Sequence, residues 1–273
     1  MKKSILHILF LSIFVPLTFA QSPWTKQKGK AYVQLGLTSL QYNKQHINGN
    51  QVDLNADFSD ITTQIYTDYG LTNQLEAQLI IPFKIVDYKS KTGGFSNNLS
   101  GFGNLGLGLK YKLYDQNWKI SFGLQYAANS ITKNPSKNLS TGFNANTFLP
   151  YLTAGSSYQK WYFFGNVGYG YMDNQYSDFL KFGGELGYNV SQKGHLILVL
   201  ENKKIISKEN AFFNDVNQWA SYSDRQSYSA VGLKFNYEFK KDKFGANFAI
   251  IGATGIDNAA LAPTLNFGLY TKL

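Results

Sequence analysis

The side chains of this sequence that could do chemistry are spread singly through apolar segments and form no recognisable catalytic motif. Amide, ammonium and carboxylate groups recur at alternate positions, so they would share one face of an extended chain. Such a face can line a water-filled passage and hydrogen-bond a polar solute. The candidates for this lining are Gln34, Gln64, Asn104, Lys110, Gln125, Asn166, Lys181, Glu185, Lys234, Asn247 and Asn266.

Catalysis has little support in the sequence. Beyond residue 20 the histidines are His46 and His195, and neither belongs to a nucleophile motif of the kind that a barrel lipase or acyltransferase would use. The chain has no cysteine, which excludes disulfides, thiol nucleophiles and cysteine-ligated metals. Two histidines also argue against a zinc site. We therefore expect no enzyme, no metal and no cofactor, with a barrel lipase or acyltransferase as a less favoured alternative.

The elements that carry these polar groups have an apolar period of two. Between 105 and 113, leucine and tyrosine fill the odd positions, whereas glycine and lysine fill the even ones. This alternation is typical of a β-strand with one apolar face. Twelve such strands are predicted, at 29–41, 58–70, 74–87, 101–114, 117–129, 145–158, 160–172, 178–190, 194–206, 225–239, 243–254 and 260–272. Most have the length of about 9–11 residues with which a tilted strand crosses a bilayer.

The connections between these strands alternate in length. Short turns are predicted near 71–73, 115–117, 159–160, 191–194 and 240–242, and longer polar loops near 42–57, 88–100, 130–144 and 207–224. Asp57 and Asp60 are interpreted as a solvated end of the first long loop. Bacterial outer-membrane barrels have short periplasmic turns and longer outer loops.

The predicted fold is therefore all-β, a transmembrane antiparallel up-and-down β-barrel of about twelve strands. Hydrocarbon cannot hydrogen-bond peptide groups, so a sheet in the membrane must close on itself. An even number of strands returns both termini to the same side. The alternative is a secreted β-sandwich, which also alternates but turns its apolar face inward.

Composition and the first residues indicate where the chain acts. Charged residues make up 16% of the chain, the net charge is +9, and the mean hydropathy of −0.25 rules out a bundle of membrane helices. Residues 1–20 have the pattern of a cleaved signal peptide, with Lys2 and Lys3 before an apolar stretch and Thr18-Phe19-Ala20 at the cleavage site. Residues 21–273 would then form the barrel domain. The lysines form no basic helix or patch, so no nucleic-acid partner is expected.

Two motifs resemble those of a known outer-membrane family. The segment YGLTNQLE at 69–76 is similar to a YGLTDRLEL turn, and GFGNLGLGLKYKL at 101–113 is similar to a GxGDLxLGLKYRL strand. The family is labelled as transporters of the phenol-degradation meta pathway. The chain departs from it at Asn73, Gln74 and Asn104, where the family has Asp, Arg and Asp. The resemblance implies an outer-membrane barrel with a transport role and names no solute.

A barrel of this size leaves room for small solutes. Twelve strands about 4.8 Å apart and tilted by about 40° give a backbone radius of about 12 Å, and inward side chains would narrow the passage to a radius of about 5 Å. Loops or the N-terminal segment could plug it. We expect a channel for passive movement of small molecules across the outer membrane. Outer-membrane lipid, lipopolysaccharide and, during biogenesis, the barrel-assembly machinery are the expected partners.

A structural or ligand-binding, adhesive barrel without an open pore is the alternative. The first and last long loops carry apolar residues that could bind a hydrophobic ligand or simply pack together. They are Ile47, Val52, Leu54, Phe212, Phe213, Val216 and Trp219.

The lysines of the inner face permit two interpretations. Five of them, Lys110, Lys112, Lys119, Lys234 and Lys272, fall toward the predicted periplasmic end. As a cationic collar they would favour anions weakly, because salt screens such charges. If each lysine is instead paired with an acidic side chain, no selectivity is expected.

Overall fold

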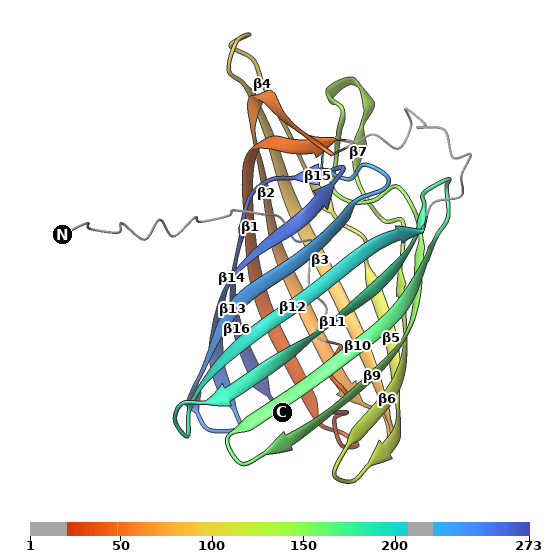
Figure 1. The fold of residues 1–273 in the computed structure, drawn as a ribbon, viewed down its shortest axis with the longest axis vertical. Helices are drawn as coiled ribbons and strands as arrows, with labels where there is room; N and C mark the ends of the chain where they lie inside the picture. The colour runs from red at the N-terminus through yellow and green to blue at the C-terminus, as the bar shows by residue number, and fades with distance from the viewer. Residues whose placement is uncertain (1–20, 48, 207–220) are drawn as a thin grey trace, which may run out of the picture.

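Antiparallel strands form a closed barrel in the computed structural model, which describes residues 21–47, 49–206 and 221–273 (Figure 1). Within these residues the wall has twelve strand positions, one of which is shared by β4 and β5. The wall strands are β1 (Ala31–Ile47), β2 (Asn50–Gly70), β3 (Leu75–Ser90), β4 (Ser96–Phe102), β5 (Gly106–Asp115), β6 (Lys119–Ala127), β9 (Thr147–Tyr158), β10 (Trp161–Met172), β11 (Asp178–Asn189), β12 (Gly194–Ile206), β13 (Ser227–Lys240), β14 (Phe244–Asp257) and β16 (Thr264–Lys272).

The remaining elements are short. A hairpin of β7 (Lys133–Asn134) and β8 (Leu139–Ser140) encloses the 3-10 turn η1 (Pro135–Lys137), and β15 (Ala259–Ala260) pairs with the outer end of β1. No helix among the described residues is long and apolar enough to cross a membrane.

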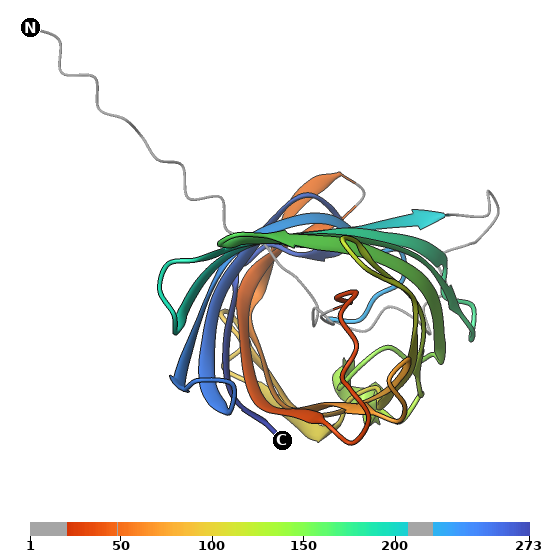
Figure 2. The ribbon, with the colours of Figure 1, turned by 90° about the horizontal axis from the view of Figure 1, so that it is seen from below.

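The first and last wall strands close the barrel. β1 pairs with β2 on one side and with β16 on the other, so that Gly36 lies opposite both Gln64 and Gly268. Figure 2 shows the resulting ring from the end that carries the short turns. Closure satisfies the backbone hydrogen bonds of the wall without leaving a sheet edge, as a span through hydrocarbon requires.

The apolar face of the wall points outward. On β5, Leu107 and Leu109 are 56% and 50% exposed, whereas Lys110 between Leu109 and Tyr111 is only 1% exposed. The partner of Lys110 on β3 is Glu76, which is fully buried inside. A β-sandwich would bury the leucines and expose the charges. The sandwich alternative is therefore wrong, and the outer surface has the character of one that faces lipid.

Two inward glycines make room for aromatic rings. A Cβ atom at Gly123 would lie 2.1 Å from the ring of Tyr151, and one at Gly187 would lie 1.9 Å from the ring of Tyr162. Both distances are far below van der Waals contact. Glycine on the concave face therefore lets these tyrosines lie flat against the wall.

The predicted strands and short turns are confirmed, with two corrections to the loops. Each predicted strand falls on one wall position, and the five short turns lie where the spacing placed them. The loops expected at 42–57 and 88–100 are instead mostly strand. Polar pairs such as Lys44 with Asp53 and His46 with Gln51 continue the ladder beyond the apolar band, because β-pairing needs no apolar side chains where water covers both faces.

The predicted strand at 101–114 is also interrupted. It begins earlier, as β4, and breaks at 103–105 before resuming as β5. Both pieces pair with β3. The break lies at Asn104, and the side chain of that residue explains it, as described below.

Candidate functional site in the barrel lumen

The N-terminal segment, residues 21–28, enters the lumen from the short-turn end (Figure 2). Gln21 is 1% exposed, and its amide donates to the side-chain oxygen of Gln125 on β6 at 3.1 Å. The hydroxyl of Ser121, on the same strand, donates to the backbone carbonyl of Pro23 at 2.7 Å. The segment is thus bound to the inner wall by hydrogen bonds.

Aromatic contacts and the first short turn fix the two sides of this segment. The ring of Trp24 meets the rings of Tyr162 and Phe164 edge-on, with centroid distances of 5.9 and 6.0 Å. Near its exit from the barrel, the backbone N–H of Lys28 donates to the side-chain oxygen of Asn73 at 3.2 Å. Asn73 is one of the positions where the sequence departs from the motif quoted above, and its amide oxygen can still accept this bond.

A buried ion pair lies beneath the segment. Lys110 Nζ is 2.7 Å from Glu76 Oε1, and the two side chains are 1% and 0% exposed. Lys110 also donates to the carbonyls of Ser22 and Trp24 at 3.1 Å each. Glu76 accepts from the backbone N–H of Lys26 at 2.7 Å. Both charges are therefore compensated by each other and by the segment, which is what makes their burial tolerable.

A polar belt continues from this pair across one wall. The amide of Gln78 donates to Asp68 at 3.0 Å and to the hydroxyl of Tyr66 at 3.1 Å. Gln125 donates in turn to Gln78 at 3.3 Å and accepts from Gln21. The belt links the N-terminal segment to the inner faces of β2, β3 and β6.

Asn104 anchors a second inward-folded segment, residues 128–146. Its amide nitrogen lies 3.0, 2.9 and 3.3 Å from the carbonyl oxygens of Ala128, Phe143 and Ala145, and its amide oxygen accepts from the backbone N–H of Phe143 at 2.8 Å. These bonds replace the strand pairing that is interrupted between β4 and β5. An aspartate, the residue of the similar motif, could accept but could not donate.

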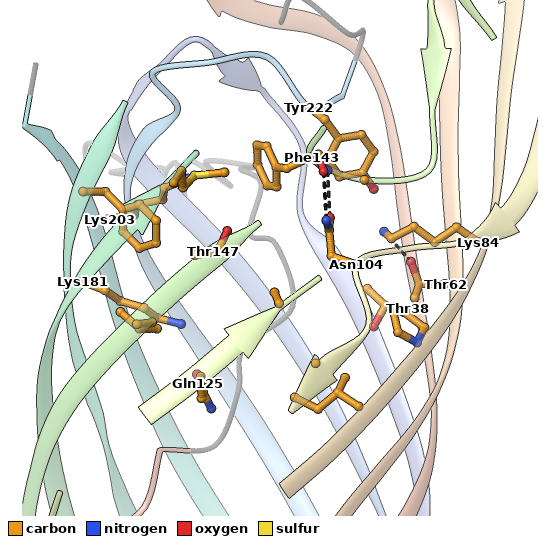
Figure 3. Close-up of a pocket in the computed structure, with 18 of the residues that line it drawn as sticks. Thr38, Thr62, Lys84, Asn104, Gln125, Phe143, Thr147, Lys181, Lys203 and Tyr222 are labelled. Atoms are coloured by element: carbon orange, nitrogen blue, oxygen red, sulfur yellow. Dashed lines mark hydrogen bonds between the residues drawn. The ribbon is translucent and has the colours of Figure 1, made fainter. Parts of the chain in front are cut away.

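The upper cavity lies in the long-loop half of the lumen and has a volume of about 180 Å³ (Figure 3). Most of its surface is apolar. Its wall includes Thr38, Leu40, Asp60, Thr62, Ile80, Lys84, Asn104, Gln125, Phe143, Leu149, Met172, Phe179, Lys181, Glu201, Lys203, Tyr222 and Tyr228.

A closed set of hydrogen bonds covers one side of the upper cavity. Lys84 Nζ lies 3.2 Å from Asp60 Oδ1 and donates to the hydroxyl of Thr62 at 2.8 Å. Tyr222, from the loop before β13, donates its hydroxyl proton to Asp60. Burial, together with the charge of Asp60, holds the pKa of Tyr222 well above its ordinary value, so this hydroxyl stays protonated.

The opposite side of the upper cavity carries two lysines in different environments. Lys181 Nζ is 3.5 Å from Glu201 Oε2. Lys203 instead lies over two rings, with its ammonium 4.9 Å from the centroid of Phe143 and 4.6 Å from that of Phe179. In Figure 3 these lysines approach from the opposite wall to Lys84.

The lower cavity lies in the short-turn half, has a volume of about 720 Å³ and is more polar. Lys234 Nζ is 2.5 Å from Glu185 Oε1. The amide of Asn247 donates to Gln34 at 3.1 Å. The walls of the lower and upper cavities share Thr38 of β1, a strand that lies four wall positions round the barrel from β6, where the N-terminal segment is anchored.

Ten of the eleven predicted lining residues lie on the inner faces of wall strands, and Asn104 lies in the break between β4 and β5. Asn104, Gln125 and Lys181 line the upper cavity. Gln34, Gln64, Glu185, Lys234, Asn247 and Asn266 line the lower one. Asn166 lines a third cavity of about 60 Å³. Lys110 lines none of these cavities, because the N-terminal segment covers it.

The five lysines of the predicted collar all have acidic partners. Besides the pairs of Lys110 and Lys234, Lys272 lies 2.5 Å from Glu238, and Lys112 and Lys119 share one carboxylate, that of Asp115, at 2.6 and 2.5 Å. This arrangement matches the second interpretation, paired lumen charges. Whether the barrel selects between ions stays a prediction.

Several residues of the upper cavity were missed or misplaced by sequence reasoning. Asp60, expected at a solvated loop end, is 5% exposed and lies in the lumen, because β2 extends through that region. Glu201 and Lys203 were missed because the inner face of β12 is apolar at Ile197 and Val199, which hides the alternation. Positions 197, 199, 201 and 203 are every second residue of one strand and therefore share its inner face. This spacing could have predicted that Glu201 and Lys203 point into the lumen.

The histidines and the apolar loop residues have no catalytic arrangement among the described residues. His195 lines the lower cavity, and its Nδ1 is 2.6 Å from the side-chain oxygen of Asn189. His46 lies in β1, not in a loop. Ile47 and Val52 are exposed near the tip of the β1–β2 hairpin, whereas Leu54 packs against buried residues. Phe212, Phe213, Val216 and Trp219 lie outside the described residues.

Three solved structures show which fold this is. The chain is similar to the COG4313 outer membrane channel from Pseudomonas putida, with a TM-score of 0.71 and 14% identity over 94% of this chain and 100% of the other. It is also similar to the KdgM porin, with a TM-score of 0.51 and 8% identity over 88% and 98% of the two chains.

The third structure widens the comparison beyond porins. It is the β domain of a Bordetella autotransporter, with a TM-score of 0.51 and 10% identity over 90% and 100% of the two chains. Similarity at that level is common to outer-membrane barrels with different roles, so it establishes the fold alone. The barrel thus has the architecture of outer-membrane proteins, with its lipid-facing surface outside.

Sequence comparison identifies the family. No curated protein matches the chain. A family model described as "Putative MetA-pathway of phenol degradation" matches residues 25–254, which include both motifs and most of the barrel wall. The resemblance noted from the motifs at 69–76 and 101–113 is confirmed, and the chain belongs to this family.

Proposed function

We propose that the protein is an outer-membrane channel through which small molecules move passively. The observation that carries the proposal is a polar, cavity-bearing lumen inside a closed barrel with an apolar outer surface. Its similarity to a solved outer membrane channel over the whole of that chain supports the same role.

The proposed route follows the inner face of β1. The N-terminal segment occupies the side of the lumen against β5, β6 and β10. The lower cavity, whose wall includes Ser22 and Lys26 of the segment, and the upper cavity both reach Thr38 on β1, where the Thr38 hydroxyl lies 2.7 Å from Asn266 Oδ1. A solute would pass from one cavity to the other at this threonine. Such a narrow route suits small solutes and excludes folded chains.

The proposal includes the absence of an enzymatic role. The structural relatives named above are a channel, a porin and an autotransporter domain. In the described part of the chain, the side chain of His195 contacts an asparagine, and His46 lies in the β1–β2 ladder. Neither histidine is placed like the base of a serine hydrolase. Turnover of phospholipid by the purified protein would contradict this part of the proposal.

Residues 1–20 are proposed to be removed as a signal peptide, so that the barrel domain begins at Gln21. Outer-membrane lipid, lipopolysaccharide and the assembly machinery are its proposed partners in the envelope. The mass of the protein purified from outer membranes tests the cleavage site: a chain that starts at Gln21 is expected, and a retained Met1 would contradict it.

A liposome swelling assay tests the channel itself. Liposomes that contain the mature protein are expected to swell in small neutral solutes. Swelling should stop at a solute radius below the value of about 5 Å for an unplugged barrel, because the N-terminal segment narrows the lumen. Empty liposomes and liposomes with a heat-denatured sample are the controls. No swelling in any solute would favour the structural or adhesive alternative.

A further inference from the structure

Lys203 is the exceptional charge of the upper cavity. Its side chain is 7% exposed, and no hydrogen bond or ion pair of its ammonium is found among the described residues. Among the described residues, the carboxylates whose charges act on it are Glu201 and Asp224. Burying an ammonium without a counter-ion is costly, and two aromatic faces offset only part of that cost.

Both of those carboxylates are already engaged. Glu201 lies 3.5 Å from Lys181 and accepts from the hydroxyl of Tyr228 at 2.7 Å. Asp224 accepts from the backbone N–H and the hydroxyl of Ser177, at 2.7 and 3.0 Å, and its charge is compensated by the guanidinium of Arg225 at 3.8 Å. Neither lies within ion-pair distance of Lys203.

The charges of the cavity wall therefore do not cancel. The charged residues of the wall are three lysines and two carboxylates, and each carboxylate is paired with one lysine. One positive charge is left, at Lys203. A ligand that bears one negative charge would neutralise the cavity.

The rest of the wall indicates that the uncharged part of such a ligand would be apolar. Leu149, Met172 and Phe179 belong to one apolar cluster beside Lys203, and Ile80 faces them from β3. Beside the charged groups, most of the wall consists of apolar and aromatic side chains. A strongly hydrated anion would lose its water to a surface that offers few hydrogen bonds in return.

We propose that the upper cavity binds a small amphipathic monocarboxylate, with its carboxylate on the Lys203 ammonium and its apolar body on the Leu149, Met172 and Phe179 surface. Charge-assisted hydrogen bonds would hold the head. Burial of the body would supply the hydrophobic contribution. The proposal deepens the channel function, on which it rests for the ligand's route into the barrel, by naming the class of solute.

Calorimetric titration of the detergent-solubilised protein tests this directly. Hexanoate is the probe. Hexan-1-ol is its neutral counterpart, and acetate has the carboxylate without the long alkyl chain. On the wild type, hexanoate is expected to bind about tenfold or more tighter than either of the others. Equal binding of hexanoate and hexan-1-ol, equal binding of hexanoate and acetate, or no binding of hexanoate would each overturn the proposal. These wild-type results stand whether or not any variant folds.

Matched variants of adjacent lysines assign the site. Lys203→Met keeps most of the length of the side chain and removes its charge, and it is expected to weaken hexanoate binding about tenfold while sparing hexan-1-ol. Lys203→Arg should retain binding. Lys204→Met removes the same charge one position along β12 on the exposed face and should have no effect. Loss of binding in Lys204→Met but not in Lys203→Met would overturn the assignment.

Failure of this proposal and failure of the channel function can be told apart. Calorimetry in detergent needs no open pore, whereas swelling of liposomes in neutral sugars needs no carboxylate site. Swelling without hexanoate binding would leave a channel and remove the proposed ligand class. Binding without swelling would leave the ligand site and remove passive transport.

Discussion

Glu76 and Lys110 face each other directly across the β3–β5 ladder, and their charged atoms are 2.7 Å apart inside the barrel. Each also holds the N-terminal segment, Glu76 through the backbone of Lys26 and Lys110 through the carbonyls of Ser22 and Trp24. The pair therefore fixes the segment that narrows the lumen. The width of the channel depends on this pair as well as on the number of strands.

Lys110→Met is expected to widen the channel. The substitution removes two hydrogen bonds to the segment and leaves the Glu76 carboxylate buried without its partner, which costs about 3–5 kcal/mol. Release of the segment relieves that cost by admitting water to Glu76. Single-channel conductance should therefore rise, while the ring of paired strands stays intact.

Two further variants serve as controls for this release. Lys112 lies on the same strand, but its ion-pair partner is Asp115 and it makes no bond to the described residues 21–28 of the segment. Lys112→Met should therefore leave the conductance unchanged. The double variant Glu76→Gln with Lys110→Met should recover stability but not the segment contacts. An unchanged conductance in Lys110→Met would show that the segment does not narrow the pore.

Thr38→Phe is expected to obstruct the proposed route. Thr38 belongs to the walls of both cavities, so a large ring there should lower conductance about twofold or more. Leu35→Phe adds the same ring on the lipid-facing side of β1, where Leu35 is exposed, and should have no effect. Equal conductance of the two variants would place the route elsewhere.

Asn104→Asp should loosen the folded segment of residues 128–146. The carboxylate loses the donors to three carbonyls, and unsatisfied buried groups cost about 1–3 kcal/mol. Faster proteolysis within 128–146 and a lower denaturation temperature on gels are the expected results. Asn117→Asp, at an exposed position in the short turn between β5 and β6, is the matched control. If both variants resist protease like the wild type, Asn104 does not anchor the segment.

Gly123→Ala should destabilise the barrel, because its Cβ would overlap the ring of Tyr151. Overpacking of this kind typically costs about 1–3 kcal/mol. At Gly165 the nearest atom to an added Cβ is 3.6 Å away, an ordinary contact, so Gly165→Ala should be tolerated. Urea unfolding in detergent compares the two. Equal midpoints would contradict the steric argument.

Alternation predicted the wall of the barrel because each strand meets lipid on one side and the lumen on the other. The parity that placed Leu107 outside also placed Lys110 inside. Alternation could not predict the contents of the lumen. The segment at residues 21–28 has no period and is held by contacts with residues far along the chain, such as Gln125, which is 104 positions from Gln21. Asp60 was misplaced because polar strand extensions and loops have the same composition.

The most direct measurement of the central claim is single-channel conductance of the refolded mature chain in a planar bilayer. If the polar lumen forms a continuous passage, the protein should give small, uniform conductance steps that increase in Lys110→Met. Insertion without any conductance, in the wild type and in Lys110→Met alike, would show that the lumen is closed and would contradict the account.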